Sequence, residues 1–318
     1  IGLSSIDNKE FFNPSNLNFY SSENQKICEL NLSRFNSEKV KYTTLKRSVL
    51  IEFLKNKLFA NNLRFGKEVK KISQIKEKLL INFKDNTNDL VDFIVISDGV
   101  FSNTKSIVEN KSIQPVYNGS IAIRTILKNL PESNYDKNSI SLIMLKNAHI
   151  VIYPINKKGE LNVVCIIRQK LSNNIDLKAL IKKEIIPQNK NLESLFENKL
   201  EYWPIYTSKK PSKSIYENLF YIGDAFFTFP PTMAQGASQS IEAANELFNF
   251  LSKDNKHTPD LFFKKRLERT KVINRRSKLN HHIFHFSNPI LKTIRNESLK
   301  IMLKNKIFLN NYIRKVYN

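Results

Sequence analysis

The spacing of hydrophobic residues changes several times along the chain and predicts a mixed fold. Alternating or continuous apolar runs predict strands at 16–20, 26–30, 63–65, 69–72, 79–83, 91–96 and 219–222. Three or four longer alternating strands are predicted at 121–127, 139–145, 149–155 and 161–167. Spacings of three and four residues predict helices within 41–60, 236–251, 261–279 and 290–316, the first capped by Thr43 or Thr44. This mixture indicates an α/β fold.

Two of the predicted strands end in a carboxylate beside a glycine. The run 219–222 stops at Gly223-Asp224, and the run 91–96 stops at Ser97-Asp98-Gly99. Open α/β sheets hold their ligands at the carboxyl edge of the strands. Both ends are therefore candidate ligand-binding positions.

A helix start follows the first of these strand ends. After the stiff Pro230-Pro231 pair, Gln235-Gly236 opens a segment with apolar residues at helical spacing. A glycine at a helix start lets a ligand approach the free N–H groups and the positive end of the helix dipole. The alternative is an ordinary strand-loop-helix unit in which Asp224 caps its own turn.

Composition narrows the class of protein. The 318 residues include 51 Lys and Arg against 29 Asp and Glu, a formal charge of +22. The basic residues are scattered, so we interpret them as solvated surface rather than as a nucleic-acid site. Cys28 and Cys165 show no disulfide or metal spacing, which favours a reducing, cytoplasmic location. No apolar run reaches the length of a membrane span.

The C-terminal part, 253–318, is basic and helical, and its charged runs are interpreted as solvated helix faces. His281, His282 and His285 lie together there, but no acidic or cysteine ligand is nearby. We therefore expect no metal site. Arg47 lies in the first turn of the helix predicted within 41–60, and it is either a surface residue or a phosphate ligand.

The chain resembles the FAD-dependent aromatic-ring hydroxylases, in their salicylate hydroxylase-like branch. Its strongest match is to the GDAAH…P..AQGA…IEDA signature, through Gly223-Asp224-Ala225, Pro231, Ala234-Gln235-Gly236-Ala237 and Ile241-Glu242-Ala243. Weaker matches are Arg47 and Leu50 to R..L, Asp98, Gly99 and Ser102 to GADG..S.VR, and His149, Tyr153, Pro154, Gly159 and Asn162 to H..YP...G...N.V. Trp203 and Pro204 also fit the family's pattern.

The resemblance implies an FAD-dependent monooxygenase that consumes NADH or NADPH. It implies that dioxygen adds to the flavin as a 4a-hydroperoxide and that oxygen passes to an aromatic or related ring compound. It also implies cofactor-binding roles for Arg47, Asp98, Gly99, Asp224, Pro231, Gln235, Gly236 and Ala237. The alternative is a non-catalytic or membrane-surface-associated protein with a vestigial flavin site.

Several positions depart from the family pattern. Lys105 replaces the closing arginine of GADG..S.VR, which bears on nicotinamide use because lysine lacks bidentate geometry. Phe226-Phe227 replace Ala-His, so that loop offers no ionisable group. If the substrate must be deprotonated, His149 or another residue must be the base, and we assign no catalytic residue. The alternative for His149 is an ordinary hairpin with one half-exposed histidine.

The sequence also lacks a G-x-G-x-x-G and an N-terminal βαβ unit for the ADP half of FAD. We therefore expect the chain to begin inside a longer protein. The expected parts are a strand pair of the substrate-side sheet (1–40), two FAD-binding parts (41–110 and 216–252), a substrate-binding sheet (111–215) and C-terminal basic helices (253–318).

Overall fold

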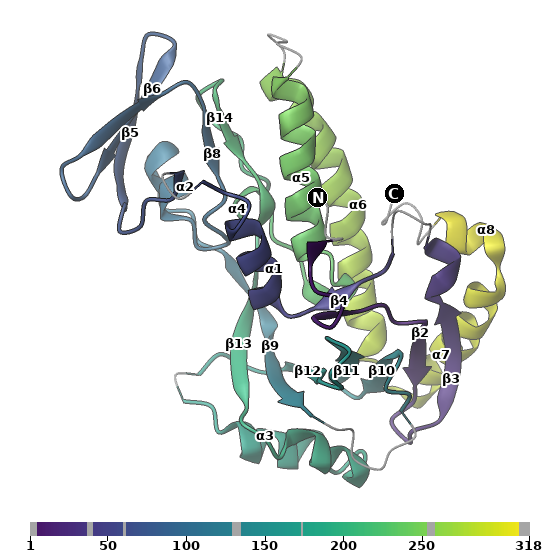
Figure 1. Ribbon diagram of the computed structural model, residues 1–318. Coiled ribbons are helices and arrows are strands. Elements are labelled where there is room, and N and C mark those ends of the chain that lie inside the picture. Colours follow the sequence, from purple (N-terminus) through teal and green to yellow (C-terminus); the bar gives the residue numbers. More distant parts are fainter. Residues whose placement is uncertain are drawn as a thin grey trace. The chain divides into compact units, whose positions relative to one another are not determined.

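The computed structural model describes residues 5–36, 41–59, 62–128, 135–172, 174–252 and 258–311. Contacts divide the chain into two compact units (Figure 1). The first unit comprises 1–60, 119–204 and 282–318, and the second comprises 61–118 and 205–281. Each unit therefore combines segments that are far apart in the sequence.

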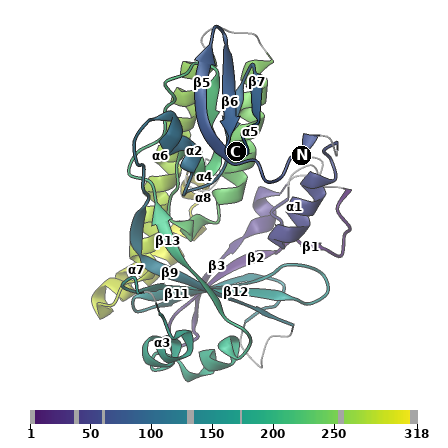
Figure 2. The ribbon, with the colours of Figure 1, turned by 90° about the vertical axis from the view of Figure 1, so that its left-hand side faces the viewer.

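The first unit is built on a seven-stranded sheet in the order β13-β9-β12-β11-β10-β2-β3 (Figures 1 and 2). Its strands are β2 (Asn16–Tyr20), β3 (Lys26–Asn31), β9 (Val116–Leu127), β10 (Ile140–Leu145), β11 (Ala148–Pro154), β12 (Leu161–Arg168) and β13 (Glu201–Thr207). β10 runs parallel to β2, whereas the β2–β3, β10–β11, β11–β12 and β12–β9 pairs are antiparallel. The sheet is therefore mostly antiparallel, as the alternating runs predict.

The remaining elements of the first unit surround this sheet. They are β1 (Phe11–Phe12), β4 (Thr44–Leu45), α1 (Arg47–Lys55), α3 (Leu177–Glu184), α7 (Pro289–Lys304), α8 (Lys306–Leu309), and the 3₁₀ helices η2 (Leu32–Phe35) and η4 (Lys190–Phe196). α3 and η4 lie below one face of the sheet in Figures 1 and 2 and bury Ile181, Ile185 and Leu192. On the other face, α7 and α8 pack over β2, β3 and β10, where Phe19, Leu142 and Met144 form the core.

The second unit contains two smaller sheets. β8 (Ile94–Ile96) and β14 (Leu219–Tyr221) form a parallel pair, and β5 (Val69–Ile75), β6 (Lys78–Phe83) and β7 (Asn88–Val91) form an antiparallel sheet. Its helices are α2 (Asn103–Val108), α4 (Gly223–Phe226), η5 (Pro231–Met233), α5 (Gly236–Leu251) and most of α6 (Thr258–Phe284). α5 and α6 run side by side (Figures 1 and 2). Phe220 of β14 packs against Leu247 and Phe262 from these two helices.

The α/β fold class is confirmed, with two local corrections. The predicted strand at 63–65 does not form, and Phe65 is exposed beside Gly66, which adopts φ +72°. The helix predicted within 41–60 has no side-chain cap, because Thr44 lies in β4 and its hydroxyl donates instead to the Pro154 carbonyl. The predicted helical stretch 290–316 extends partly outside the described residues. No described helix has the length and apolarity that a membrane crossing requires.

Candidate functional site

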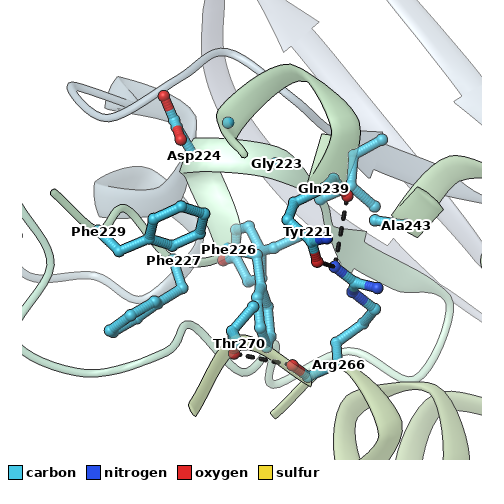
Figure 3. Close-up of a pocket in the computed structure, with 12 residues that line it drawn as sticks. Tyr221, Gly223, Asp224, Phe226, Phe227, Phe229, Gln239, Ala243, Arg266 and Thr270 are labelled. Atoms are coloured by element: carbon cyan, nitrogen blue, oxygen red, sulfur yellow. Dashed lines mark hydrogen bonds between the residues drawn. The ribbon is translucent and has the colours of Figure 1, made fainter. Parts of the chain in front are cut away.

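The site is built on a sharp turn at the carboxyl end of β14. Gly223 has φ +58°, and a Cβ there would lie 2.7 Å from the Ser240 hydroxyl of α5. Both the backbone conformation and the close approach of α5 therefore require glycine. The turn exposes the next side chain, Asp224, whose carboxylate projects away from the aromatic side chains below it (Figure 3).

The start of helix α5 is the second component of the site. Gln235 precedes the helix and is buried, but its side chain does not cap the first N–H groups. Gly236 is exposed, and a Cβ placed there would have no atom within 4 Å. Ala237 is also exposed, as is Pro231 in the loop before it. The positive end of a 16-residue helix thus opens onto free space beside a glycine.

A cavity of about 10 Å³ lies between the Asp224 turn and α5. It is large enough for a single water molecule. Its walls come from β14, α4, α5 and α6, namely Tyr221, Ile222, Gly223, Asp224, Phe226, Phe227, Phe229, Gly236, Gln239, Ala243, Arg266 and Thr270 (Figure 3). The two glycines and Asp224, singled out in the sequence, therefore meet around one small opening.

Arg266 anchors α6 beneath this opening, and its buried position was not predicted. Its side chain is 2% exposed and donates at 2.9 Å to both Glu242 and Glu246 and at 2.8 Å to the Gln239 amide oxygen. The interpretation of the basic C-terminal run as a solvated face is therefore wrong at this position. A signal was present in the sequence, since Glu242 and Glu246 are four residues apart on one helix face and need a cation.

Glu242 also binds Arg269, whose Nε lies 2.8 Å from its carboxylate. Burial alone would raise the pKa of Glu242, but hydrogen bonds and charge from Arg269 and Arg266 hold it below its ordinary value. The carboxylate is therefore ionised at neutral pH and ties α5 to α6.

The second predicted strand end lies at the same sheet edge. Tyr221 pairs with Ile96 in the parallel register, so Asp98 and Gly223 each follow their strand by two residues. Gly99 adopts φ +88°, which favours glycine, and Asp98 accepts a long 3.4 Å bond from the Thr104 N–H. The structure thus brings both strand-end carboxylates to one edge, as predicted.

Lys105 lies under the Asp224 turn. It is 4% exposed, and its ammonium donates to the Ala225 carbonyl at 3.4 Å. Burial lowers the pKa of Lys105, and the nearby charges of Glu109 and Asp98 oppose that change. The departure from arginine therefore places a buried lysine cation beneath the turn, where it contacts the backbone.

Arg47, His149 and His285 belong to the first unit. Arg47 is the first residue of α1, exposed on the first unit, and so does not belong to the cluster described for the second unit. His149 is 1% exposed, with Nδ1 2.7 Å from His285 Nε2, so the alternative of an ordinary hairpin with a half-exposed histidine is wrong. His285 follows the end of α6 at Phe284. Across the described ranges, no three His, Cys, Asp or Glu residues are grouped as metal ligands would be.

The donor set fits a cofactor with a polyol chain and a planar, electron-rich ring. An exposed carboxylate at Asp224 can accept hydroxyl hydrogen bonds, and the open space over Gly236 allows a flat group to approach the uncapped helix start. These are chemical properties that FAD requires of a site.

Solved structures share this fold. Klebsiella pneumoniae HpxO, solved with FAD and uric acid, superposes with a TM-score of 0.85 at 14% identity, over 98% of this chain and 82% of that one. A substrate complex of salicylate hydroxylase superposes with a TM-score of 0.75 at 14% identity, over 99% of this chain and 86% of that one. The p-nitrophenol 4-monooxygenase PnpA from Pseudomonas putida DLL-E4 superposes with a TM-score of 0.76 at 13% identity, over 99% of this chain and 83% of that one. The predicted resemblance to FAD-dependent aromatic hydroxylases is therefore confirmed in the fold.

The sequence model of one family covers most of the chain. The squalene epoxidase family matches residues 91–314, and the chain belongs to this family. No curated protein matches the sequence.

Proposed function

We propose that the protein is an FAD-dependent monooxygenase that takes electrons from NADH or NADPH and hydroxylates an aromatic or related ring compound. The observation that carries this proposal is the junction of the Asp224 turn with the open, uncapped start of α5. Asp224 would hold the ribityl hydroxyls, while Gln235, Gly236 and Ala237 would lie against the ring. When bound, FAD supplies the electron transfer and the activation of dioxygen.

The chain's own contribution is positioning and charge. The N-terminus of α5 would stabilise negative charge on a reduced ring, and Arg266 fixes α5 against α6 so that this terminus is held in place. Asp98, Gly99 and Pro231 would complete the cofactor's surroundings, and the cofactor-binding role of Arg47 remains a prediction. Phe226 and Phe227 are buried and contribute no proton-transfer group.

The known relatives of the fold support the choice of substrate class. HpxO was solved with uric acid, and PnpA is named for p-nitrophenol; both compounds are acidic rings. We therefore propose a ring compound with dioxygen as co-substrate. The free cysteines Cys28 and Cys165 are in keeping with a cytoplasmic location.

We also propose that a preceding segment binds the ADP half of FAD. β8 and β14 form a sheet of two parallel strands within the described residues, whereas parallel sheets normally have more strands and are covered on both faces. Val95 of β8 is 44% exposed, and Phe93, just before this strand, is 54% exposed. A βαβ segment beside β8 would cover them, so the 318-residue chain alone is expected to bind FAD weakly.

The test is Asp224→Ala in the full-length protein, with flavin content and FAD affinity measured by absorbance and titration. A charge-assisted bond to a ribityl hydroxyl is worth about 1.5–3 kcal/mol, so a loss of affinity of about tenfold or more is expected. Asp92→Ala is the matched control, because Asp92 is an exposed carboxylate of the same unit, at the amino end of β8. Unchanged flavin affinity in Asp224→Ala would overturn the assignment.

A second candidate, contact with a membrane surface, is favoured by one feature of α7. Ile290, Ile294 and Ile301 are 69%, 56% and 69% exposed and share one side of this basic helix. Exposed apolar residues flanked by lysines suit an anionic bilayer surface. Sedimentation with phosphatidylserine vesicles tests this candidate, and Ile294→Asp is expected to abolish it. Equal sedimentation of the variant and the parent would exclude it.

A further inference from the structure

A second, larger cavity lies in the second unit, between the loop before β14 and the start of α6. Its volume is about 320 Å³, which is within the range of small-molecule sites. We call it the Phe263 pocket, and its walls are residues 212–217, 219–221, 226, 259, 260, 262 and 263. Neither Asp224 nor Gly236 lines it, so it is distinct from the candidate cofactor site.

Aromatic side chains contribute to the wall of the Phe263 pocket from the loop, from β14, from α4 and from α6. Phe220 packs against Phe262 and Phe226 packs against Phe263, with ring centres 5.9 Å apart in each pair and interplanar angles of 82° and 76°. These near-perpendicular contacts are a favoured arrangement of aromatic rings. The rings are therefore held in place by one another before any ligand arrives.

A lysine side chain already places its charge against this wall. The Lys213 ammonium lies over the Phe263 ring, 5.4 Å from its centre, and 3.1 Å from an Asp260 carboxylate oxygen. A cation at this distance is attracted by the negative face of the ring. The side chains of Lys213 and Asp260 are 60% and 77% exposed, so water screens their ion pair and makes it weak. Lys213 can therefore leave the ring at little cost.

The charges around the Phe263 pocket favour a second cation. Among the described residues that line it, the carboxylates Glu217 and Asp260 stand against the ammonium of Lys213. Glu217 forms no ion pair with another described residue, so its charge is not neutralised. An anionic ligand would be repelled by both carboxylates, whereas a cationic ligand would be attracted by them and by the ring faces.

We propose that the Phe263 pocket binds a substituted ammonium group, with Phe263 against the charge and with Asp260 and Glu217 balancing it. Lys213 occupies the site when the ligand is absent and is displaced when the ligand binds. Alkyl groups on the nitrogen suit the site, because they pack against the aromatic wall while the charge spreads over them. This inference goes beyond the proposed monooxygenase function, since the pocket contains none of the residues assigned to FAD.

The assay is a calorimetric titration of the full-length protein at constant ionic strength with two probes of the same shape. Choline carries a trimethylammonium group, and 3,3-dimethylbutan-1-ol has an uncharged carbon in place of the nitrogen. Saturable binding is expected with choline. Binding of the neutral probe should be weaker by about tenfold, because it keeps the alkyl contacts and loses the attraction of the rings and carboxylates.

Four variants locate the effect. Lys213→Met removes the competing ammonium and should tighten choline binding severalfold. In the Lys213→Met background, Phe263→Leu and the surface change Asp260→Asn should each weaken binding by about tenfold. Lys210→Met is the matched control, because Lys210 is an exposed lysine of the same loop that does not line the pocket. It should leave the affinity for choline unchanged.

Three results would overturn the inference. One is the absence of saturable choline binding in both the parent and Lys213→Met. Another is equal affinity for choline and the neutral probe. The third is equal affinity of Lys213→Met and Lys210→Met, which would show that Lys213 does not occupy the binding site.

Further measurements identify the source of the ammonium group and separate this inference from the proposed function. Sedimentation with phosphatidylcholine vesicles that is lost in Phe263→Leu would assign the group to a lipid headgroup, and choline binding without such sedimentation would assign it to a soluble cation. Asp224→Ala should leave choline binding unchanged. Choline binding by a full-length protein that holds no FAD would overturn the proposed function alone and leave the Phe263 pocket standing.

Discussion

Gly236→Ala offers the sharpest test of the cofactor site, because the same methyl group should be harmless to the protein and harmful to the flavin. A Cβ at position 236 meets no atom within 4 Å, and the residue begins α5. Alanine is favoured over glycine in helices by up to about 1 kcal/mol, and by less at the first position. The flavin-free variant should therefore melt at the parent's temperature or slightly above it.

With flavin bound, the outcome reverses. The added carbon projects about 1.5 Å, which would displace a ring in van der Waals contact by about 1 Å. The attraction between half a charge at the α5 terminus and a ring anion is about 2 kcal/mol at 4 Å and an effective dielectric of 20. At 5 Å this attraction is weaker by about 0.4 kcal/mol. For a two-electron couple this loss lowers the reduction potential of the flavin by about 10 mV.

The assay is a spectroscopic redox titration of the full-length protein, together with the peroxide released per nicotinamide oxidised. A lower potential and more released peroxide are expected for Gly236→Ala. Asn249→Ala is the control, because it adds an alanine to an exposed position of the same helix, far from its start. If the potential and the coupling of Gly236→Ala equal those of the parent, the ring does not lie against this helix start and the reasoning is refuted.

Three further outcomes follow from the packing of the second unit. In thermal melts, Gly223→Ala should destabilise the fold more than Gly66→Ala. Both residues have positive φ, but only the Cβ added at 223 meets a neighbour, the Ser240 hydroxyl at 2.7 Å. Equal losses of stability would show that the turn relaxes. Arg266→Met should lower the free energy of unfolding by about 1.5–3 kcal/mol in urea titrations, since it removes charge-assisted hydrogen bonds to the partly buried Glu242 and Glu246, which keep Arg269 and Lys265 as partners; a loss below about 1 kcal/mol would contradict this role. The lowered pKa of Glu242 contributes to the stability of the fold. This contribution is complete above the unfolded pKa of about 4.5 and is lost as the pH falls through the folded pKa. Thermal melts at acid pH should therefore show this loss in the parent and less of it in Arg266→Met.

The local sequence determined the candidate site at the carboxyl end of β14. A strand, a Gly-Asp turn and a helix beginning at Gly236 are contiguous between residues 219 and 251, so hydrophobic period and glycine placement were enough to predict them. Asp98 and Gly99 were predicted on the same grounds, because the end of a parallel strand fixes which edge its next residues occupy. Roles in FAD binding for these residues, and the functional division of the chain into parts, remain predictions.

Tertiary structure alone decided which charges are buried and which side chains meet across the sheet. The hydrophobic periodicity of α6 is weak, and only the packing of α6 against α5 shows that Arg266 points inward. Burial of His149 depends likewise on His285, which is 136 residues away in the chain. Arg124 and Trp203 meet because β9 and β13 are neighbours in the sheet order. Pairing between distant strands is set by the burial of the whole sheet, and no local pattern encodes it.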